Sequence, residues 1–335
     1  MIEYETIGRS SQMLIYVAGI LALILTLLAG IPYLDFLKKK LYGQYIREEG
    51  PASHEAKSGT PTTGGIILVI PAIIAALLML TMEQVLGVKS LIVFFTLLLF
   101  MMLGFNDDYL KISKKENEGV TPRKKLAFQA AIALIPALYV TLQGNTALSL
   151  FGLAEIDLGC IYPFLAIFII VGTSNAVNLT DGLDGLAAGT SFFTFIAVAI
   201  ISYWQGITEL AIISASIAGS CLGFLWSNKN PAKMFMGDTG SIALGGGLGT
   251  LAVIGKFELW LVIIGMVFVI ETLSVIIQVI SFKTTGKRVF KMSPIHHHFE
   301  LSGWSEPKVV YMFWTVGLAF AALGVVLFSL TNGII

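Results

Sequence analysis

The stretch CIYPFLAIFIIVGTSNAVNLTDGLDGLAAGTSFFTFIAVAIISYW, residues 160–204, places two apolar runs on either side of a short polar turn. Each run is close to the roughly 20 residues that a helix needs to cross the hydrocarbon core of a bilayer. The turn between them carries Asn178, Asp181 and Asp184. The pattern predicts two membrane-spanning helices whose connection places two carboxylates and an amide at the membrane surface.

The composition of the whole chain agrees with this interpretation. The 335 residues are 56% hydrophobic and 13% charged, and the mean hydropathy is +0.84. Soluble domains carry about 25% charged residues, so a water-soluble protein is excluded. Cys160 and Cys221 lie far apart without metal-ligand spacing, which argues against a disulfide framework and a zinc site. We expect one integral membrane domain over residues 1–335, and no nucleic-acid partner.

Apolar runs of spanning length recur along the chain and predict an all-α polytopic membrane protein with about ten transmembrane helices. The runs are 13–34, 64–82, 89–105, 126–143, 160–177, 186–204, 209–226, 240–255, 257–282 and 308–331. The first is expected to be a retained span, since no basic leader precedes it. The eighth is the weakest, being short and rich in glycine, although small residues let neighbouring helices approach closely.

Basic residues divide unevenly between the two sides of these ten spans. Of the 21 Lys and Arg residues, only Arg9, Lys89 and Lys256 fall on one side. Cytoplasmic loops carry the excess of Lys and Arg, so the basic side is expected to face the cytoplasm and both termini to lie outside.

Five polar stretches fall on the predicted cytoplasmic face: 57–65, 104–111, 178–185, 230–241 and 293–300. Their aspartates are expected at helix ends and are Asp107, Asp108, Asp181, Asp184 and Asp238. Any one of them could be a solvated loop residue. Gathered together they would raise one another's pKa, and a bound cation would relieve that repulsion. Mg²⁺ fits best, because it takes one or two carboxylates together with water and phosphate oxygens.

Two glycine-rich stretches indicate what such a cation would serve. GTPTTGG (59–65) precedes a predicted helix, and GDTGS (237–241) opens another. Free backbone N–H groups at helix N-termini bind phosphate readily. The alternative is ordinary helix capping by Thr and Ser. Lys57 and Lys111 could add positive charge to a phosphate site, although lysines at this face also serve membrane topology.

Three consecutive histidines, His296, His297 and His298, lie in the last polar stretch. Their side chains splay apart, so they are not expected to bind a single metal; one or two of them are expected to face a phosphate-bearing substrate. Glu271 is the one carboxylate deep in a predicted span, and Gln278 follows seven residues later on the same helix face. Glu271 is either functional, or it stays protonated or hydrogen-bonds to Thr272 or Ser274 and stabilises the helix.

Five motifs together resemble the phospho-N-acetylmuramoyl-pentapeptide transferases: GTPTTGG, GFNDDYLK, NAVNLTDGLDGLA, FMGDTGS and PIHHHFE. The first four resemble motifs shared across the polyprenyl-phosphate N-acetylhexosamine-1-phosphate transferases, and PIHHHFE indicates the muramoyl-pentapeptide branch. The resemblance runs from the first span to the last. One departure is Thr63, where the family pattern has methionine, in a loop with fewer basic residues than expected.

The resemblance implies transfer of phospho-MurNAc-pentapeptide from UDP-MurNAc-pentapeptide to undecaprenyl phosphate, giving lipid I and UMP with the help of Mg²⁺. It also implies a homodimer in the bacterial inner membrane with a cytoplasmic active site. On the family pattern Asp238 binds the metal, and Asp107 and Asp108 lie by the lipid phosphate. Asp107, Asp108, Asp238 and His297 are the catalytic candidates. The substrate-binding candidates are Lys57, Thr62, Lys111, Asn178, Asp181, Gly182, Asp184, Asn228, Phe235, Gln278, His296 and His298.

The reaction itself leaves some alternatives open. A phosphate monoester has a second pKa near 6 and is mostly ionised at neutral pH, so Asp107 is expected to matter more for geometry and charge than for proton removal. Direct displacement and a covalent aspartyl-phosphate route both remain open. Two rival functions are a transferase that uses UDP-GlcNAc and a secondary transporter of an anionic solute, whose binding residues would lie near the membrane midplane.

Overall fold

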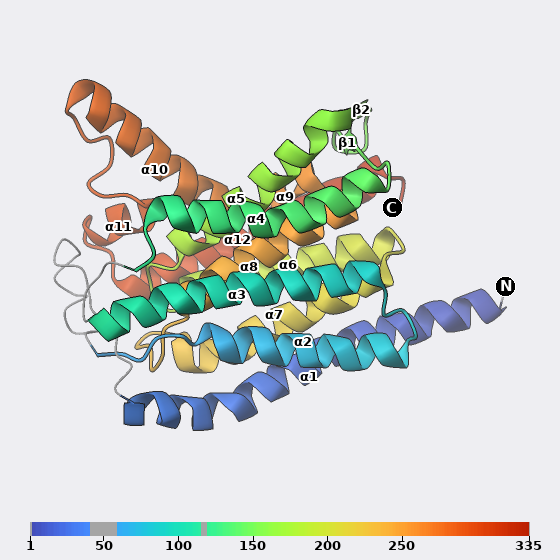
Figure 1. Cartoon of the computed structure of the whole chain (residues 1–335), viewed down its shortest axis with the longest axis horizontal. Coiled ribbons are helices and arrows are strands. Elements are labelled where there is room, and N and C mark those ends of the chain that lie inside the picture. Colours follow the sequence, from blue (N-terminus) through green and yellow to red (C-terminus); the bar gives the residue numbers. More distant parts are fainter. Residues whose placement is uncertain (1, 41–58, 115–118, 335) are drawn as a thin grey trace.

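A computed structural model of the chain describes residues 2–40, 59–114 and 119–334, with side chains described from residue 12 onward (Figure 1). Its elements in chain order are α1 (Ile2–Lys40), α2 (Gly65–Met82), α3 (Val88–Lys114), α4 (Pro122–Leu142), β1 (Ala147–Ser149), β2 (Glu155–Asp157), a 3-10 turn (Gly159–Ile161), α5 (Tyr162–Thr180), α6 (Leu186–Trp204), α7 (Thr208–Asn228), α8 (Gly237–Gly255), α9 (Glu258–Ile264), α10 (Met266–Thr285), α11 (Ile295–Glu300) and α12 (Glu306–Thr331).

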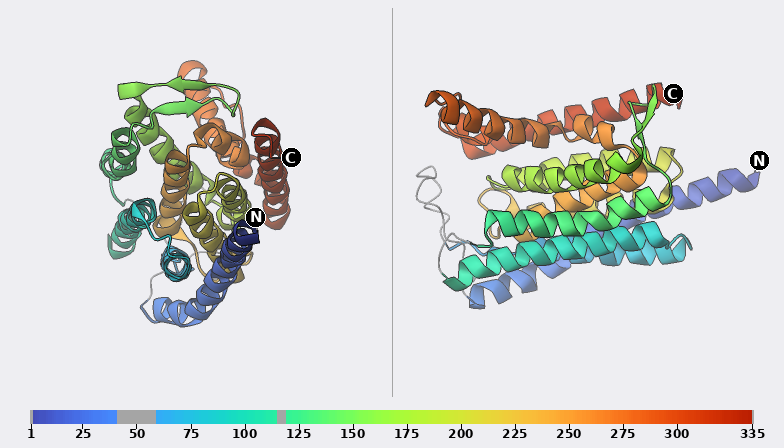
Figure 2. Two further views of the ribbon diagram at one scale, coloured as in Figure 1. Left: turned by 90° about the vertical axis from the view of Figure 1, so that its right-hand side faces the viewer. Right: turned by 45° about the horizontal axis from the view of Figure 1, so that its top comes forward.

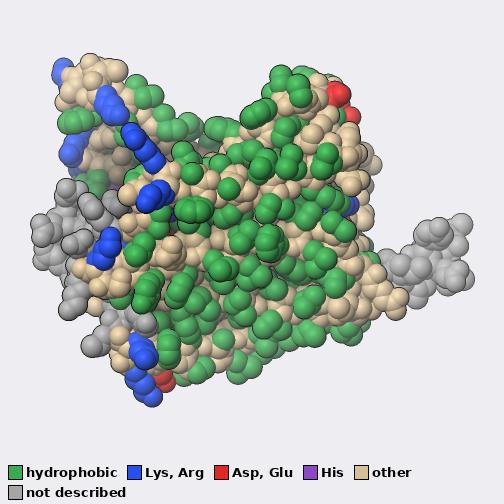
Figure 3. All heavy atoms as spheres, in the orientation of Figure 1, with side chains coloured by type: hydrophobic (Ala, Val, Ile, Leu, Met, Phe, Trp, Pro, Cys, Tyr) green, Lys and Arg blue, Asp and Glu red, His purple; other side chains and the backbone are tan. Residues whose placement is uncertain are grey.

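Nine helices in the described residues are long and apolar enough to cross a membrane: α1 from Gln12, then α2 to α7, α10 and α12. Hydrophobic side chains cover the middle of the face shown in Figure 3, whereas most Lys and Arg visible there lie at the end where α1, α3 and α10 end. A backbone in hydrocarbon must satisfy its own hydrogen bonds, which helices do. The expected all-α polytopic membrane protein is confirmed, with one short antiparallel hairpin, β1–β2, added to it.

Helix α8 corresponds to the weakest predicted span and is not among the nine. It runs through the middle of the bundle, packed against α3 and α5 and in contact with α2, α4, α6 and α9 (Figure 2), and every residue from Thr239 to Gly255 is buried. A Cβ at Gly245 would overlap the backbone carbonyl of Thr173, and one at Gly246 would overlap the ring of Phe100. Helix α8 therefore faces protein rather than lipid, which explains why it needs small residues more than apolar ones.

The predicted ninth span, 257–282, was wrong as a continuous helix. The structure has two helices, α9 and α10, separated at Gly265, whose φ of −103° and ψ of 23° are not helical. A Cβ at Gly265 would lie 2.8 Å from the carbonyl oxygen of Leu261. After the break, α10 diverges from the bundle (Figure 1), while its buried side chains, including Glu271 and Gln278, face inward.

Helix α3 is longer than predicted, since the third span was expected to end at residue 105. It continues to Lys114 because its inward face continues, with Leu103, Gly104, Asp107 and Asp108 all buried. Asp107 and Asp108 are consequently helical residues inside the bundle and do not lie at the end of a helix.

Both chain termini and the β1–β2 hairpin lie at one end of the bundle (Figures 1 and 2). Helix α11 and the C-terminal ends of α3 and α10 lie at the other end. The nine spans of the described residues and the buried helix α8 together cross the bundle ten times. An even number of crossings places both ends of the chain on the same side, as observed. That the α11 end faces the cytoplasm remains a prediction.

Candidate active site

Three carboxylates from two helices converge at the α11 end of the bundle. Asp107 and Asp108 lie late in α3, and Asp238 lies in the first turn of α8. Each side chain offers an oxygen within 4.8 Å of the other two. Asp107 and Asp108 are buried, and the side chain of Asp238 is 15% exposed. The sequence prediction that these distant aspartates share one site is consistent with this geometry.

Asp108 binds the N-terminus of α8. Its Oδ1 accepts a hydrogen bond from the backbone N–H of Asp238 (3.1 Å), and its Oδ2 accepts from the backbone N–H and the hydroxyl of Thr239 (3.0 and 2.6 Å). These backbone groups have no partner within the helix, and a carboxylate there also interacts favourably with the helix dipole. Asp108 therefore joins α3 to α8 and fixes the first turn that carries Asp238.

The glycine-rich stretch before α2 packs on the same turn. Gly64 and Gly65 donate backbone hydrogen bonds to the carbonyls of Phe235 and Met236, both at 2.9 Å, and Phe235 donates to the carbonyl of Pro61 (2.8 Å). The N–H groups expected to be free for phosphate are thus used within the protein, in α2 by this loop and in α8 by Asp108. Tertiary contacts satisfy these N–H groups, and phosphate binding at the two helix N-termini stays a prediction.

Two lysines and an amide surround Asp238. Lys111 and Lys125 both bind its Oδ2, with Nζ at 3.0 and 2.8 Å, and Asn178 donates to its Oδ1 at 2.7 Å. Lys111 also pairs with Oδ2 of Asp107 at 2.5 Å. Three carboxylates against two ammonium groups leave one net negative charge at the centre when all are ionised.

Sequence reasoning did not identify Lys125 as a site residue, because it is one of many basic residues predicted on this face. In the structure Lys125 lies one helical turn before Gln129, the first buried residue of α4. Gln129 binds Ser174 and Asn175 of α5, so Lys125 lies on the inward face of α4. Lys124 next to it is exposed.

Two further candidates lie beside the carboxylates. Burial, together with the negative charges of Asp238 and Asp108, raises the pKa of Asp181 to about 8. The hydroxyl of Thr62 is buried and has no hydrogen-bond partner in the described residues. A Cβ at Gly237 would touch both this hydroxyl and Oδ2 of Asp108, so Thr62 also borders the centre.

Asp184 and Asn228 hold loops around the site. Asp184 accepts from the backbone N–H of Ala232 (2.9 Å) and the side chain of Asn230 (3.2 Å). Asn228 accepts from the N–H of Gly185 (3.1 Å) and donates to the carbonyl of Met234 (3.0 Å). Their expected contact with substrate stays a prediction. These hydrogen bonds show that both side chains stabilise the loops around the site.

A residue that sequence reasoning missed completes this arrangement. Glu306, in the first turn of α12, accepts from the backbone N–H of Asp184 (2.8 Å) and from Asn230 (3.0 Å). No local feature of the sequence connects Glu306 with a loop 122 residues earlier.

Gln278 and His298 hold the segment that leads into α11. Gln278 accepts from the backbone N–H groups of Val289 and Phe290 (3.0 and 2.9 Å) and donates to the carbonyl of Phe290 (3.1 Å). Nδ1 of His298 accepts from the N–H of Lys291 (3.1 Å). Substrate contact by these two side chains is also untested and stays a prediction.

The other two histidines contact each other, with ring centroids 4.1 Å apart. His296 is buried, whereas His297 is half-buried and pairs through Nδ1 with Glu300 (2.8 Å). A Cβ at Gly182 would overlap Nε2 of His296, so that ring lies directly against the turn after α5. Phe235 is half-buried beside α2, and Lys57 lies outside the described residues.

Glu271 does not make the contacts suggested for a helix-stabilising role. The hydroxyls of Thr272 and Ser274 donate to the backbone carbonyls of Phe268 and Glu271 itself. The carboxylate of Glu271 instead lies 3.1 Å from Nδ1 of His296. The suggested hydrogen bond of the carboxylate to Thr272 or Ser274 is therefore wrong.

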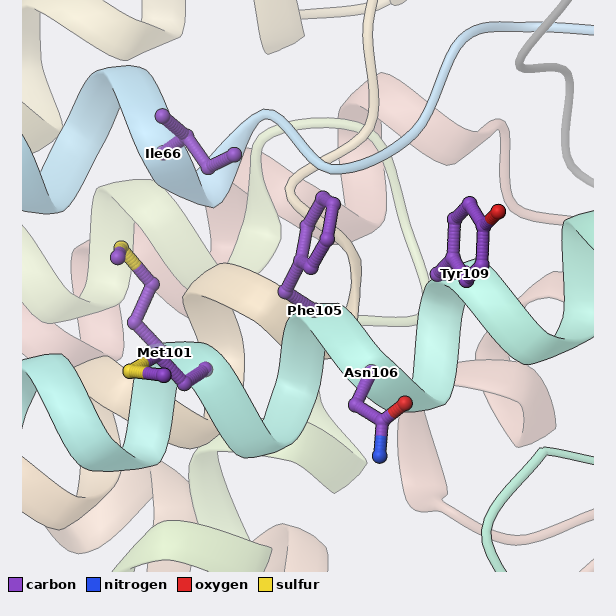
Figure 4. Close-up of a pocket in the computed structure, with 6 residues that line it drawn as sticks. Ile66, Met101, Phe105, Asn106 and Tyr109 are labelled. Atoms are coloured by element: carbon purple, nitrogen blue, oxygen red, sulfur yellow. The ribbon is translucent and has the colours of Figure 1, made fainter.

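A cavity of about 360 Å³ lies between α2 and α3 (Figure 4). It is lined by side chains of α2 and α3, namely Ile66, Met101, Met102, Phe105, Asn106 and Tyr109. Its almost wholly apolar walls suit a hydrocarbon chain better than a nucleotide.

Comparisons with known proteins agree with the motifs. Residues 90–256 match the family model described as glycosyl transferase family 4. The chain is 51% identical to the phospho-N-acetylmuramoyl-pentapeptide-transferase of Geobacillus sp. (strain WCH70) over 316 residues, which cover 94% of this chain and 98% of the relative. The protein of that name from Anoxybacillus flavithermus is 51% identical over 320 residues. The one from Bacillus subtilis (strain 168) is 50% identical over 294 residues, or 87% of this chain and 91% of the relative.

Proposed function

Because the chain belongs to the phospho-N-acetylmuramoyl-pentapeptide transferase family, we propose that its Asp107–Asp108–Asp238 centre transfers phospho-MurNAc-pentapeptide from UDP-MurNAc-pentapeptide to undecaprenyl phosphate. The products are lipid I and UMP, and the reaction is a membrane step of peptidoglycan synthesis. The observation that carries the assignment of the site is the convergence of α3 and α8, which brings three carboxylates and two lysines together at one end of a membrane bundle.

The centre fits a magnesium ion. With its three carboxylates and two lysines ionised, it has one net negative charge. It also has closely spaced carboxylate oxygens and a buried Thr62 hydroxyl without a partner in the described residues. Asp238 would be the principal ligand, since both oxygens of Asp108 bind the N-terminus of α8. Asp107 would contribute Oδ2, which pairs with Lys111, because its Oδ1 accepts from the backbone N–H of Val120. When bound, the ion would neutralise charge on the pyrophosphate of the sugar nucleotide.

The protein's own groups then position the reactants. An oxygen of the lipid phosphate attacks the β-phosphorus of the sugar nucleotide, a new P–O bond forms, and the bond to UMP breaks. The attacking phosphate is already ionised near pH 7, so the transfer needs no general base. Lys111 and Lys125, now paired with Asp238, can turn to the phosphates and stabilise developing charge. Asp107 holds Lys111 for this purpose.

The arrangement supports placement of the site at the cytoplasmic face of the bacterial inner membrane, in a multi-pass protein. That the protein acts as a homodimer rests on the family resemblance alone. The lysine-rich end of the bundle carries the carboxylate centre, and an excess of Lys and Arg is typical of the cytoplasmic side. UDP-MurNAc-pentapeptide would reach this end from water, and the lipid substrate from the bilayer.

A transfer assay separates this function from its rivals. Purified protein in lipid is given each sugar nucleotide with and without undecaprenyl phosphate, and UMP and the lipid-linked product are measured. We expect UMP only when the lipid acceptor is present, and much faster turnover of UDP-MurNAc-pentapeptide than of UDP-GlcNAc. Faster turnover of UDP-GlcNAc would assign the chain to another glycan precursor. Uptake of intact nucleotide into vesicles without UMP would favour transport.

The direct route is tested in a single turnover without the lipid acceptor. Sugar nucleotide labelled in the β-phosphate should leave no label on the protein after denaturation. Label recovered on Asp107 would replace direct displacement by a covalent aspartyl-phosphate intermediate.

A further inference from the structure

A buried carboxylate–histidine pair lies behind the active site. Glu271 of α10 and His296 of α11 have no exposed side-chain surface, and Oε2 of Glu271 lies 3.1 Å from Nδ1 of His296. No group in the described residues makes a well-aligned hydrogen bond to either carboxylate oxygen or either ring nitrogen. In the part of the chain that the structure describes, the contact between these two side chains is the one ion-pair contact that either of them makes.

Such burial is costly unless the two groups serve each other. A carboxylate removed from water loses its hydration, and a partner must replace it. An apolar side chain at position 271 would be less costly to bury. The outward face of α10 does carry apolar side chains, those of Leu273, Ile276 and Ile280. Ionisable groups buried in membrane proteins are commonly functional. Glu271 is thus unlike its neighbours on the helix.

The other nitrogen of His296 faces the active-site turn. A Cβ at Gly182 would overlap Nε2, so the ring lies against the backbone of the turn that carries Asp181. The His296 ring also contacts that of His297, with centroids 4.1 Å apart. His296 thus lies between Glu271 on one side and two predicted site elements on the other.

We propose that Glu271 is a positioning residue for the transfer reaction. Its carboxylate, 3.1 Å from Nδ1, favours the tautomer of His296 with the hydrogen on that nitrogen, which leaves Nε2 free as an acceptor at the Asp181–Gly182 turn and orients the ring beside His297. Carboxylates that hold one nitrogen of an imidazole select the tautomer and the orientation of the ring in this way. This inference rests on the proposed function, since it assumes that the turn borders the reacting groups.

Kinetics test the proposal through conservative variants. Glu271→Gln keeps the volume but can offer Nδ1 either an acceptor or a donor, and Glu271→Leu removes the partner. We expect kcat to fall about 10-fold in Glu271→Gln and up to about 100-fold in Glu271→Leu, the range typical of groups that orient a functional side chain, with KM for the sugar nucleotide within about twofold. The matched control is Thr272→Val, which removes a hydroxyl bonded only within α10 and should leave kcat unchanged.

A double-mutant cycle tests whether Glu271 acts through His296. If it does, adding Glu271→Gln to His296→Ala should lower kcat no further. Losses that multiply would contradict the proposal, as would wild-type kcat in Glu271→Gln. Thermal unfolding in detergent verifies that each variant is folded, and Glu271→Gln carries the test if Glu271→Leu is not.

Nitrogen NMR of histidine-labelled protein gives a readout independent of activity. The chain has four histidines, and His297 also faces a carboxylate through Nδ1. A second Nδ1–H signature, that of His296, should be present in the wild type and lost in Glu271→Leu. An unchanged spectrum would refute the tautomer assignment. Absence of transfer by the wild-type protein would instead overturn the proposed function and leave the spectroscopic result standing.

Discussion

Removal of Lys125 should strengthen cation binding at the carboxylate centre. Two ammonium groups, those of Lys111 and Lys125, occupy the same oxygen, Oδ2 of Asp238. A metal ion that takes this oxygen must displace them. Lys125→Met keeps the apolar stem of the side chain, removes the charge and changes the net charge of the centre from one negative to two.

The size of the effect follows from the contact that is lost. Nζ of Lys125 lies 2.8 Å from Oδ2 of Asp238, and both side chains are largely buried, 16% and 15% exposed. A hydrogen bond between charged groups contributes about 1.5–3 kcal/mol net. Because Lys111 shares the oxygen and remains, we use the lower value, about 1.5 kcal/mol, which corresponds to roughly tenfold in a dissociation constant.

Binding of Mn²⁺ to purified protein, followed by electron paramagnetic resonance, measures this directly and does not require turnover. We expect about tenfold tighter binding in Lys125→Met than in the wild type. Lys124→Met is the matched control, because Lys124 is adjacent and exposed, and its affinity should equal that of the wild type. Weaker or unchanged binding in Lys125→Met would refute competition between the lysine and the metal.

Three other perturbations test the fold and the site. In the folded protein Asp181 keeps its proton up to about pH 8, whereas an unfolded aspartate loses its proton near pH 4. The metal-free protein should therefore lose stability as the pH rises between these two values. Asp181→Asn should reduce this pH dependence of thermal unfolding. Gly245→Ala should destabilise the protein by about 1–3 kcal/mol, because the added Cβ would overlap α5. Gly172→Ala should not destabilise it, because there is open space at that Cβ. Similar unfolding of both variants would argue against tight packing of α8. With both native cysteines replaced, an impermeant maleimide should label a cysteine at exposed Asn145 in intact cells and one at exposed Ser302 only in inverted vesicles. The reverse pattern would invert the proposed topology.

Hydropathy predicted most of the spans because lipid-facing helices must be apolar along their whole length. It failed where helices face protein. Helix α8 is shielded from lipid by its neighbours, and its many glycines make it less hydrophobic than the nine spans of the described residues. The break at Gly265 carries no local signal, because Gly172 and Gly317 lie within unbroken helices. It depends on packing, since Gly324 of α12 receives the side chain of Ile264 just before the break.

The candidate site was predicted in outline by its motifs, and its detail depended on tertiary contacts. The acidic residues belong to distinct sequence motifs, so Asp107, Asp108 and Asp238 could be grouped before the fold was known. The sequence did not separate Lys125 from Lys124, because only the inward face of α4 distinguishes them. The contact between Glu271 and His296 depends on how α11 folds back against α10, which a predicted straight span could not show.

The most direct test of the central claim is UMP release titrated with Mg²⁺ in the wild type and in Asp238→Asn. The asparagine has nearly the same shape but cannot supply a charged oxygen. We predict that wild-type release requires Mg²⁺, stops on chelation and returns when the ion is restored, and that folded Asp238→Asn is slower by roughly 100-fold or more at every concentration. Wild-type release that persists in chelator, or undiminished release by Asp238→Asn, would contradict a magnesium-dependent transfer at the three-carboxylate centre.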